Sequence, residues 1–164
     1  MPTVNEDDLD WESLERGETA FRRKRLADAT DAEELGCSLY ELPAGKKSWP
    51  YHYHTGNEEA IYVLAGEGQL RGADEQVALV AGDYAAFPAG EDGAHRIIND
   101  SDEPLRYLAF STMNDPDIGV YPDSEKITLF GGSPPGGTGD RPLSGSYRRE
   151  DAVDYWEGEL GDEQ

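Results

Sequence analysis

The sequence has a single cysteine, two methionines and only four lysines among its 164 residues. Because one cysteine cannot pair within its own chain, an intrachain disulfide through Cys37 is excluded. We expect Cys37 to be a small buried residue at the start of a strand, and a redox role is the alternative. The first residues also lack the basic and apolar segment of a secretory signal. We therefore expect a cytoplasmic protein.

Positive charge is scarce throughout the chain. Lysine and arginine number 14 against 35 aspartates and glutamates, which gives a formal net charge of -21. Such a surface repels nucleic acids and anionic membranes, so we expect neither as a partner. An acidic surface with few lysines is also typical of proteins that work at high salt, because salt screens the repulsion between carboxylates. A halophilic source is our hypothesis, and an ordinary acidic protein is the alternative.

The sequence has no convincing long helix. Apolar runs are short and separated by turn residues, and they lie at 35–42, 61–65, 69–70, 77–80, 84–87, 96–98 and 105–112. Many short strands with turns between them predict an all-β barrel or sandwich. A chain of this length can form one core but not two comfortable domains.

The three histidines of the chain offer a possible metal site. Side chains two apart on a strand project to the same face, so His52 and His54 can converge on one point. After a short turn at 55–57, Glu59 can bring an oxygen ligand from what we expect to be the adjacent strand. His95, at the start of another apolar run, is the fourth candidate ligand. The alternative is that such histidines lie on the surface or are satisfied within the core.

These residues fall into two patterns that resemble the motifs of the cupin superfamily. The first motif is matched by Gly45, His52, His54, Glu59 and Gly66. The second is matched by Gly82, Pro88, Gly90, His95 and Asn99. One extra residue precedes His52 and two extra residues precede His95, both in connecting turns, where insertions are tolerated. The similarity runs from about Leu35 to Leu129.

The resemblance implies a double-stranded β-helix, or jelly-roll barrel, and a homodimer. It also implies that His52, His54, Glu59 and His95 bind one divalent transition-metal ion. Three imidazoles and one carboxylate suit Fe, Mn, Ni, Co, Cu or Zn and disfavour Ca. If these ligands face inward, strand alternation predicts that further side chains line the same pocket, namely Ser48, Ile61, Val63 and Ile97.

The expected partner is a small oxygen-rich metabolite that the metal binds directly. By resemblance the protein is a dioxygenase, an isomerase or a decarboxylase, and the residues do not choose among them. The sequence places no second acid or base convincingly beside the ion, so catalytic residues stay unidentified. The alternative is therefore a non-catalytic module that binds a sugar or an organic acid. In a third hypothesis the metal only stabilises the fold.

Composition, together with the resemblance, divides the chain into four segments. We expect a loosely ordered acidic arm at 1–18, the cupin barrel domain at 19–130, a flexible loop rich in Gly, Pro and Ser at 131–146, and a C-terminal tail at 147–164. In the tail, Tyr155 and Trp156 are expected to pack on the barrel or to cover its mouth.

The only basic cluster of the chain lies at 21–26. It contains Arg22, Arg23, Lys24 and Arg25. We interpret it as an edge strand or arm paired with acidic surface, and a site for an anion or a partner is the alternative.

Overall fold

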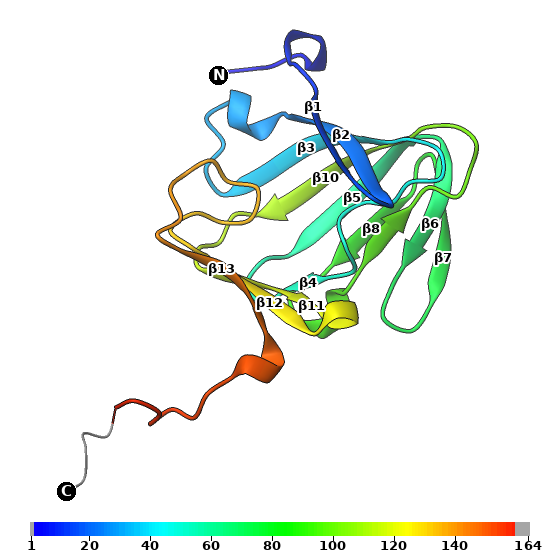
Figure 1. The fold of residues 1–164 in the computed structure, drawn as a ribbon. Coiled ribbons are helices and arrows are strands. Elements are labelled where there is room, and N and C mark those ends of the chain that lie inside the picture. Colours follow the sequence, from blue (N-terminus) through cyan, green and yellow to red (C-terminus); the bar gives the residue numbers. More distant parts are fainter. Residues whose placement is uncertain (1, 160–164) are drawn as a thin grey trace, which may run out of the picture.

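The computed structural model describes residues 2–159, and these residues form an all-β fold (Figure 1). The strands are β1 Glu12–Arg16, β2 Thr19–Arg25, β3 Leu35–Leu42, β4 Tyr53–His54, β5 Glu59–Ala65, β6 Glu67–Arg71, β7 Gln76–Val80, β8 Tyr84–Phe87, β9 Arg96–Ile98, β10 Leu105–Thr112, β11 Asp117–Tyr121, β12 Lys126–Gly131 and β13 Leu143–Arg148. Within 2–159 the helical elements are single 3-10 turns at Glu6–Asp8, Ala27–Ala29, Glu91–Gly93, Pro122–Ser124 and Arg149–Asp151. The prediction of an all-β fold is confirmed.

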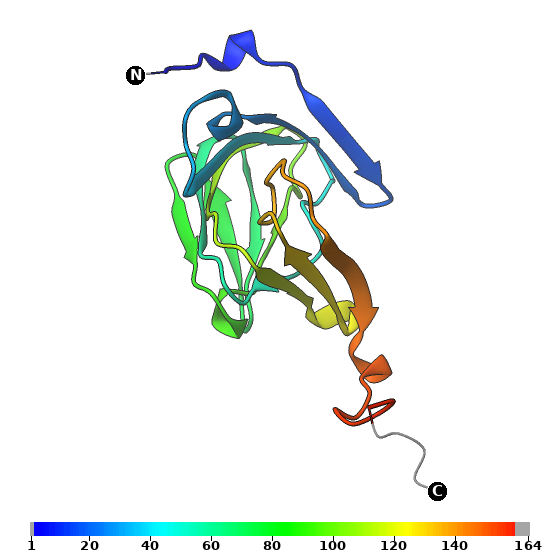
Figure 2. The same ribbon diagram turned by 90° about the vertical axis from the view of Figure 1, so that its left-hand side faces the viewer.

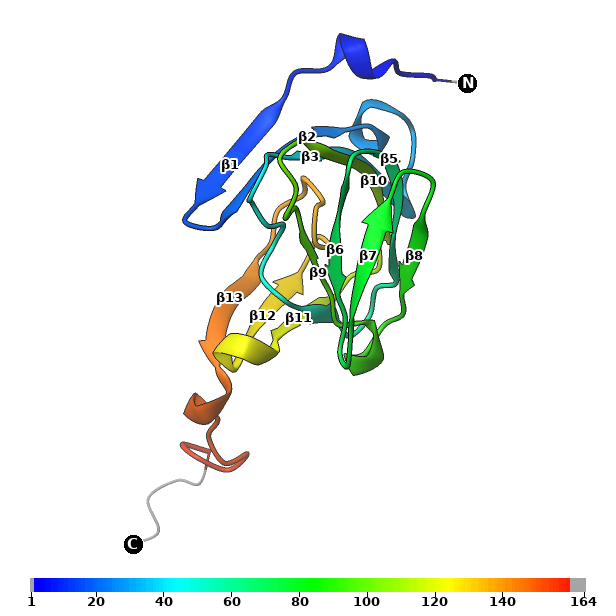
Figure 3. The same cartoon turned by 90° about the vertical axis from the view of Figure 1, so that its right-hand side faces the viewer.

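The strands form three sheets. The largest has six strands in the order β1-β2-β3-β10-β5-β8, and a four-stranded sheet has the order β13-β12-β11-β4. A third sheet, β7-β6-β9, lies beside β8 and β5 (Figure 3). Figure 2 shows the six-stranded and four-stranded sheets on different sides of the barrel, with the interior between them. All pairings within the sheets are antiparallel.

The core follows from the two-residue alternation of the strands. In β5, Ile61 and Val63 are buried, whereas Tyr62 and Leu64 between and after them are exposed. The same alternation in neighbouring strands builds one apolar cluster, which contains Phe21, Tyr40, Leu42, Ile61, Val63, Leu79, Phe87, Ile97, Leu105 and Tyr107. Burial of this cluster is the main stabilising contribution that the structure shows.

One expected pairing is wrong. Strand β4 was expected to lie next to β5, but β4 pairs with β11 while β5 pairs with β10 and β8. The histidine strand and the glutamate strand therefore belong to different sheets. The ligands meet across the interior of the barrel, which a hairpin between adjacent strands would not allow.

The ends of the chain differ in part from the expected segments. Strand β1 lies within the arm expected at 1–18, and β13 begins inside the loop expected at 131–146. The side chains of Tyr155 and Trp156 are 83% and 58% exposed and pack edge to face on one another. They do not anchor the tail on the barrel, because the segment after β13 projects away from it (Figure 1).

Some apolar side chains stay on the surface of the described chain. Tyr62, Leu64, Val77, Val80 and Tyr84 are exposed on β5, β7 and β8. The homodimer expected by resemblance stays a prediction. A helix of the length and apolar character that a membrane span requires is not found among residues 2–159.

Candidate metal centre

Two short segments hold the three imidazoles together. His52 directly precedes β4, His54 ends it, and His95 directly precedes β9. His95 donates its backbone N–H to the His52 carbonyl at 2.9 Å, and His52 returns the bond at 3.2 Å. This reciprocal pair fixes the two residues opposite each other. All three histidines are buried, with between 6% and 8% of their surface exposed.

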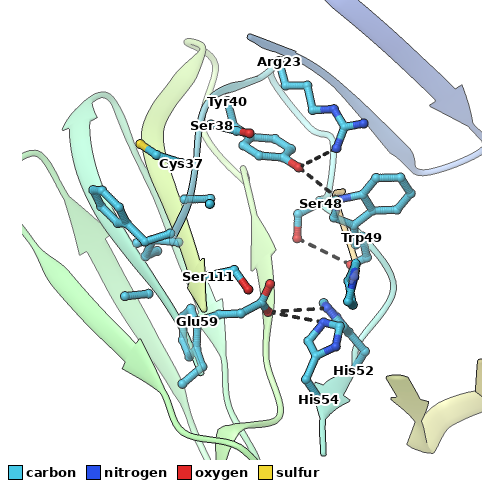
Figure 4. Close-up of a pocket in the computed structure, with 18 of the residues that line it drawn as sticks. Arg23, Cys37, Ser38, Tyr40, Ser48, Trp49, His52, His54, Glu59 and Ser111 are labelled. Atoms are coloured by element: carbon cyan, nitrogen blue, oxygen red, sulfur yellow. Dashed lines mark hydrogen bonds and ion pairs between the residues drawn. The ribbon is translucent and has the colours of Figure 1, made fainter. Parts of the chain in front are cut away.

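Glu59, the first residue of β5, reaches these imidazoles from the opposite sheet (Figure 4). Its Oε2 lies 3.8 Å from Nε2 of His52, 3.6 Å from Nε2 of His54 and 3.5 Å from Nε2 of His95. The ligand atoms of His52, His54 and Glu59 lie within 4.8 Å of one another, and His95 approaches this group through the Glu59 oxygen. The structure thus brings the four predicted side chains to one place.

The outer nitrogen of each imidazole faces an acceptor. Nδ1 of His52 lies 2.8 Å from the Pro50 carbonyl, and Nδ1 of His95 lies 2.9 Å from the Gly93 carbonyl. A carbonyl oxygen can only accept, so Nδ1 carries the proton in both rings and Nε2 presents a lone pair to the centre. Gly93 is required here, because an added Cβ would lie 1.8 Å from the Pro88 carbonyl.

The third imidazole is oriented by a carboxylate that sequence analysis did not identify. Nδ1 of His54 donates to Oδ2 of Asp117 at 2.6 Å, and the Asp117 side chain is fully buried. Oδ1 of Asp117 accepts the backbone N–H of Gly56 at 2.8 Å, which holds the carboxylate in place. A carboxylate behind a histidine fixes its tautomer and increases its basicity as a metal ligand.

The pKa shifts of Asp117 and His54 support the same hydrogen bond between them. Burial alone would raise the pKa of Asp117, but its hydrogen bond from His54 and the bond from Gly56 lower the pKa to about 2. Burial would also lower the pKa of His54, but the Asp117 hydrogen bond and the Glu59 charge raise it. Asp117 is therefore ionised at neutral pH and accepts the hydrogen bond from Nδ1 of His54.

Three imidazole lone pairs and a carboxylate oxygen then face one another. Burial holds the pKa of His52 well below its usual value, helped by His95 and His54, and burial also lowers the pKa of His95. These two rings resist protonation, so a cation is what satisfies the cluster. Two ligand atoms each about 2.1 Å from one ion are about 3.0 to 3.4 Å apart. The three separations from the Glu59 oxygen, 3.5 to 3.8 Å, are a few tenths wider than about 3.4 Å, and the donor set of imidazoles and a carboxylate fits a divalent ion.

Comparison with models of known protein families matches residues 38–111 to the cupin domain. This match spans the whole ligand set from His52 to His95. The chain contains a domain of the cupin superfamily. A search of the curated proteins finds no sequence that matches this cupin.

Solved structures resemble the cupin over most of its length. A candidate sugar phosphate isomerase from Acidithiobacillus ferrooxidans is 27% identical, with a TM-score of 0.77 and coverage of 90% of each chain. A sugar phosphate isomerase of the cupin superfamily from Silicibacter pomeroyi is 25% identical, with a TM-score of 0.78, over 92% of this chain and 95% of that one. A "predicted oxalate decarboxylase" from Thermotoga maritima is 26% identical, with a TM-score of 0.60, over 67% and 97%.

The candidate metal centre of this cupin opens into a cavity of about 480 Å³ between the two larger sheets. Ser48, Ile61 and Ile97 line it as predicted, whereas Val63 lies in the apolar core. The Ser48 hydroxyl accepts the backbone N–H of Ile97 at 3.0 Å, so this residue joins two segments of the wall. Such a volume suits a small metabolite.

Aromatic rings that the sequence motifs do not include complete the lining. Phe87 stacks on His95 with 3.7 Å between ring centroids, and Tyr121 stacks on His52 at 5.8 Å. Tyr107 and Tyr121 also line the cavity, and burial is the main cause that raises the pKa of each phenol. The residues from β11 onward have no sequence motif, so only the fold places Tyr121 beside the metal centre.

Proposed function

We propose that this cupin is a divalent-metal-dependent isomerase of a small hydroxy-carbonyl compound, such as a sugar derivative. The observation that carries the proposal is the convergence of three imidazole Nε2 atoms on the Glu59 Oε2, at 3.5 to 3.8 Å, in the wall of a cavity. The name sugar phosphate isomerase, which two similar structures carry, supports this reaction class. The name of the similar Thermotoga structure supports a decarboxylase as the alternative.

The ligand set suits Fe, Mn, Ni, Co, Cu or Zn and disfavours Ca, because imidazoles dominate it. With four protein ligands, an octahedral ion would keep two positions open and would polarise adjacent hydroxyl and carbonyl oxygens of a substrate. His52, His54, Glu59 and His95 would hold the ion, and Asp117 would keep His54 in the ligating tautomer.

The residues around the centre have separate tasks in this proposal. Ile61, Phe87 and Ile97 form apolar walls that exclude water from the bound substrate. Tyr107 is 2% exposed, and burial raises the pKa of its phenol well above the usual value, so the hydroxyl keeps its proton at neutral pH. A protonated phenol at this place can donate a hydrogen bond to a substrate oxygen.

The test is isomerisation by protein loaded separately with each metal, with aldoses, ketoses and their phosphate esters in D2O under nitrogen. Proton NMR should show interconversion, with deuterium entering next to the carbonyl if a proton is exchanged with solvent. Oxygen uptake under air would instead indicate a dioxygenase, and release of carbon dioxide from oxalate would indicate a decarboxylase. Glu59→Gln serves as the inactive control.

A non-catalytic binding module is the second candidate, and one observation favours it. Glu59 and Asp28 are the only carboxylates among the described residues that line the cavity, and Asp28 lies 3.4 Å from Arg25. The only carboxylate of the described wall that is not a candidate metal ligand is therefore held in an ion pair. Metal-dependent binding of a sugar without turnover under any of the conditions above would support this candidate.

One variant distinguishes a metal that only stabilises the fold from both the enzyme and the binding module. His54→Ala removes one ligand near Glu59. Retained folding with loss of turnover supports catalysis, retained folding with loss of sugar binding supports the module, and unfolding in the absence of metal indicates a structural ion.

A further inference from the structure

Three of the ten arginines in this acidic chain line the one cavity that contains the metal centre. Arg23 and Arg25 come from β2, and Arg141 precedes β13. Figure 4 shows Arg23 beyond Trp49 from His52 and His54, with its guanidinium directed at the Tyr40 hydroxyl. We call Arg23, Arg25 and Arg141 the arginine end of the cavity.

The charges at the arginine end do not cancel. Arg23 and Arg25 share one carboxylate oxygen, because the Nε of each lies 3.1 Å from Oε2 of Glu12. Asp28 adds a second carboxylate at 3.4 Å from Arg25. Among residues 2–159, no carboxylate forms an ion pair with Arg141. Three guanidinium groups thus face two carboxylates, in a protein whose net charge is -21.

The hydrogen bonds that Arg141 makes to its own loop do not require a positive charge. Its Nε donates to the Ser133 carbonyl at 3.0 Å, and its Nη2 donates to the carbonyls of Pro134 and Gly137. A neutral amide can also donate to carbonyls, so these contacts alone do not explain a cation here. The Arg141 guanidinium also lies 5.3 Å from the centre of the Phe130 ring, but no carboxylate of residues 2–159 pairs with it, and such a guanidinium beside a cavity attracts an anion.

Donors are available for such an anion. Arg23 uses Nε for Glu12 and Nη1 for the Tyr40 hydroxyl at 3.3 Å, and within the described chain its Nη2 has no hydrogen-bond partner. The same holds for Nη1 of Arg141. Arg25 donates to the Gly136 carbonyl at 2.7 Å and Arg141 to the next carbonyl at 3.2 Å. One turn therefore holds two of the guanidinium groups near each other.

We propose that the arginine end binds the phosphate group of a phosphorylated sugar, whose hydroxyl and carbonyl oxygens face the metal centre. This rests on the proposed function, because it assigns the two ends of one substrate to the two ends of the cavity. Guanidinium groups match phosphate through paired N–H donors, and a water-poor cavity strengthens these contacts. The basic cluster interpreted from the sequence as structural thus contributes two side chains to a binding site.

The experiment measures binding of inorganic phosphate to metal-loaded protein by calorimetry. Arg23→Gln and Arg141→Ala should each weaken phosphate binding about tenfold to a hundredfold, as expected for a charged hydrogen bond lost. Arg148→Ala is the matched control, since it removes the same charge from an exposed position outside this cavity and should change affinity less than about twofold. Metal content should stay the same in all variants.

Arg141→Ala can disturb the loop, but Arg23 makes no hydrogen bond to that loop, so the Arg23 variant tests the site independently. Equal phosphate affinity in wild type and Arg23→Gln would overturn the proposal, because phosphate would then bind the metal alone. Tighter binding of malonate than of phosphate would overturn the assignment of a phosphate group. Phosphate binding that depends on the arginines, without isomerisation, would contradict the proposed function but not this site.

Discussion

The cupin domain at 38–111 and the segments outside it contribute differently to the same cavity. The domain contains all four candidate metal ligands, from His52 to His95. The segments outside it supply Asp117, which orients His54, and further side chains that line the cavity, namely Tyr121, Phe130 and Arg141 after the domain and Arg23 before it. The comparison teaches that the motif predicts the candidate ion site, whereas the orientation of His54 and part of the cavity lining depend on strands that carry no motif.

The largest expected effect comes from removing one of the candidate metal ligands that the cupin domain supplies. His54→Ala removes an imidazole whose Nε2 lies 3.6 Å from the Glu59 oxygen, so metal affinity should fall by more than about a hundredfold. Isothermal titration with Mn, Ni, Co or Zn measures the change. Glu58→Gln is the control, because this exposed carboxylate is adjacent to Glu59 but is not one of the clustered ligands. Unchanged affinity in His54→Ala would remove His54 from the site.

The second prediction tests the contribution from outside the domain. Asp117→Ala removes the acceptor that holds Nδ1 of His54 at 2.6 Å, and loss of such an outer carboxylate typically costs about tenfold to a hundredfold in metal affinity. Asp123→Ala removes an exposed carboxylate on the neighbouring turn, paired with Arg71, and should leave metal binding unchanged. If the two variants bind metal equally well, β11 does not orient the ligands.

A third prediction uses the pH dependence of the metal-free protein. The pKa of Asp117 is lowered to about 2, so its contribution to stability is present above the unfolded value near 3.8 and is lost as pH falls toward 2. The contribution of this ionisation is about 2 kcal/mol. Chemical unfolding of wild type and Asp117→Asn should therefore differ most near pH 5 and converge near pH 2. A difference that does not change over this range would contradict the ionised pair.

The sequence predicted much of the fold because its strands are bounded by strong turn signals. The strands at 35–42, 84–87, 96–98 and 105–112 appear at the predicted bounds. The four candidate ligands could be predicted because their spacing matches a motif that strand geometry explains, and the structure brings their side chains together. The placement of β4 next to β5 was wrong, because pairing between sheets depends on contacts that no local pattern encodes.

The rest of the site could not be read from the sequence for a related reason. A buried histidine ligand needs an acceptor for its second nitrogen, but nothing distinguishes Asp117 among 35 acidic residues. Arg23 and Arg141 are likewise far apart in the sequence and meet only through the fold. Long-range tertiary contacts, and not local propensity, decide these positions.

The smallest expected effect concerns the acidic surface as a whole and not one region. If the charge of -21 reflects a halophilic source, added salt should stabilise the protein, because screening weakens the repulsion between carboxylates. Unfolding measured with increasing sodium chloride tests this. Equal stability without added salt would favour an ordinary acidic protein.

X-ray absorption spectroscopy of the metal-loaded protein tests the central claim most directly. The account predicts one ion per chain, with three imidazole nitrogens and at least one carboxylate oxygen in its coordination shell, and two imidazoles in His95→Ala. An ion bound through fewer than three imidazoles in the wild type, or no change on replacing His95, would contradict it.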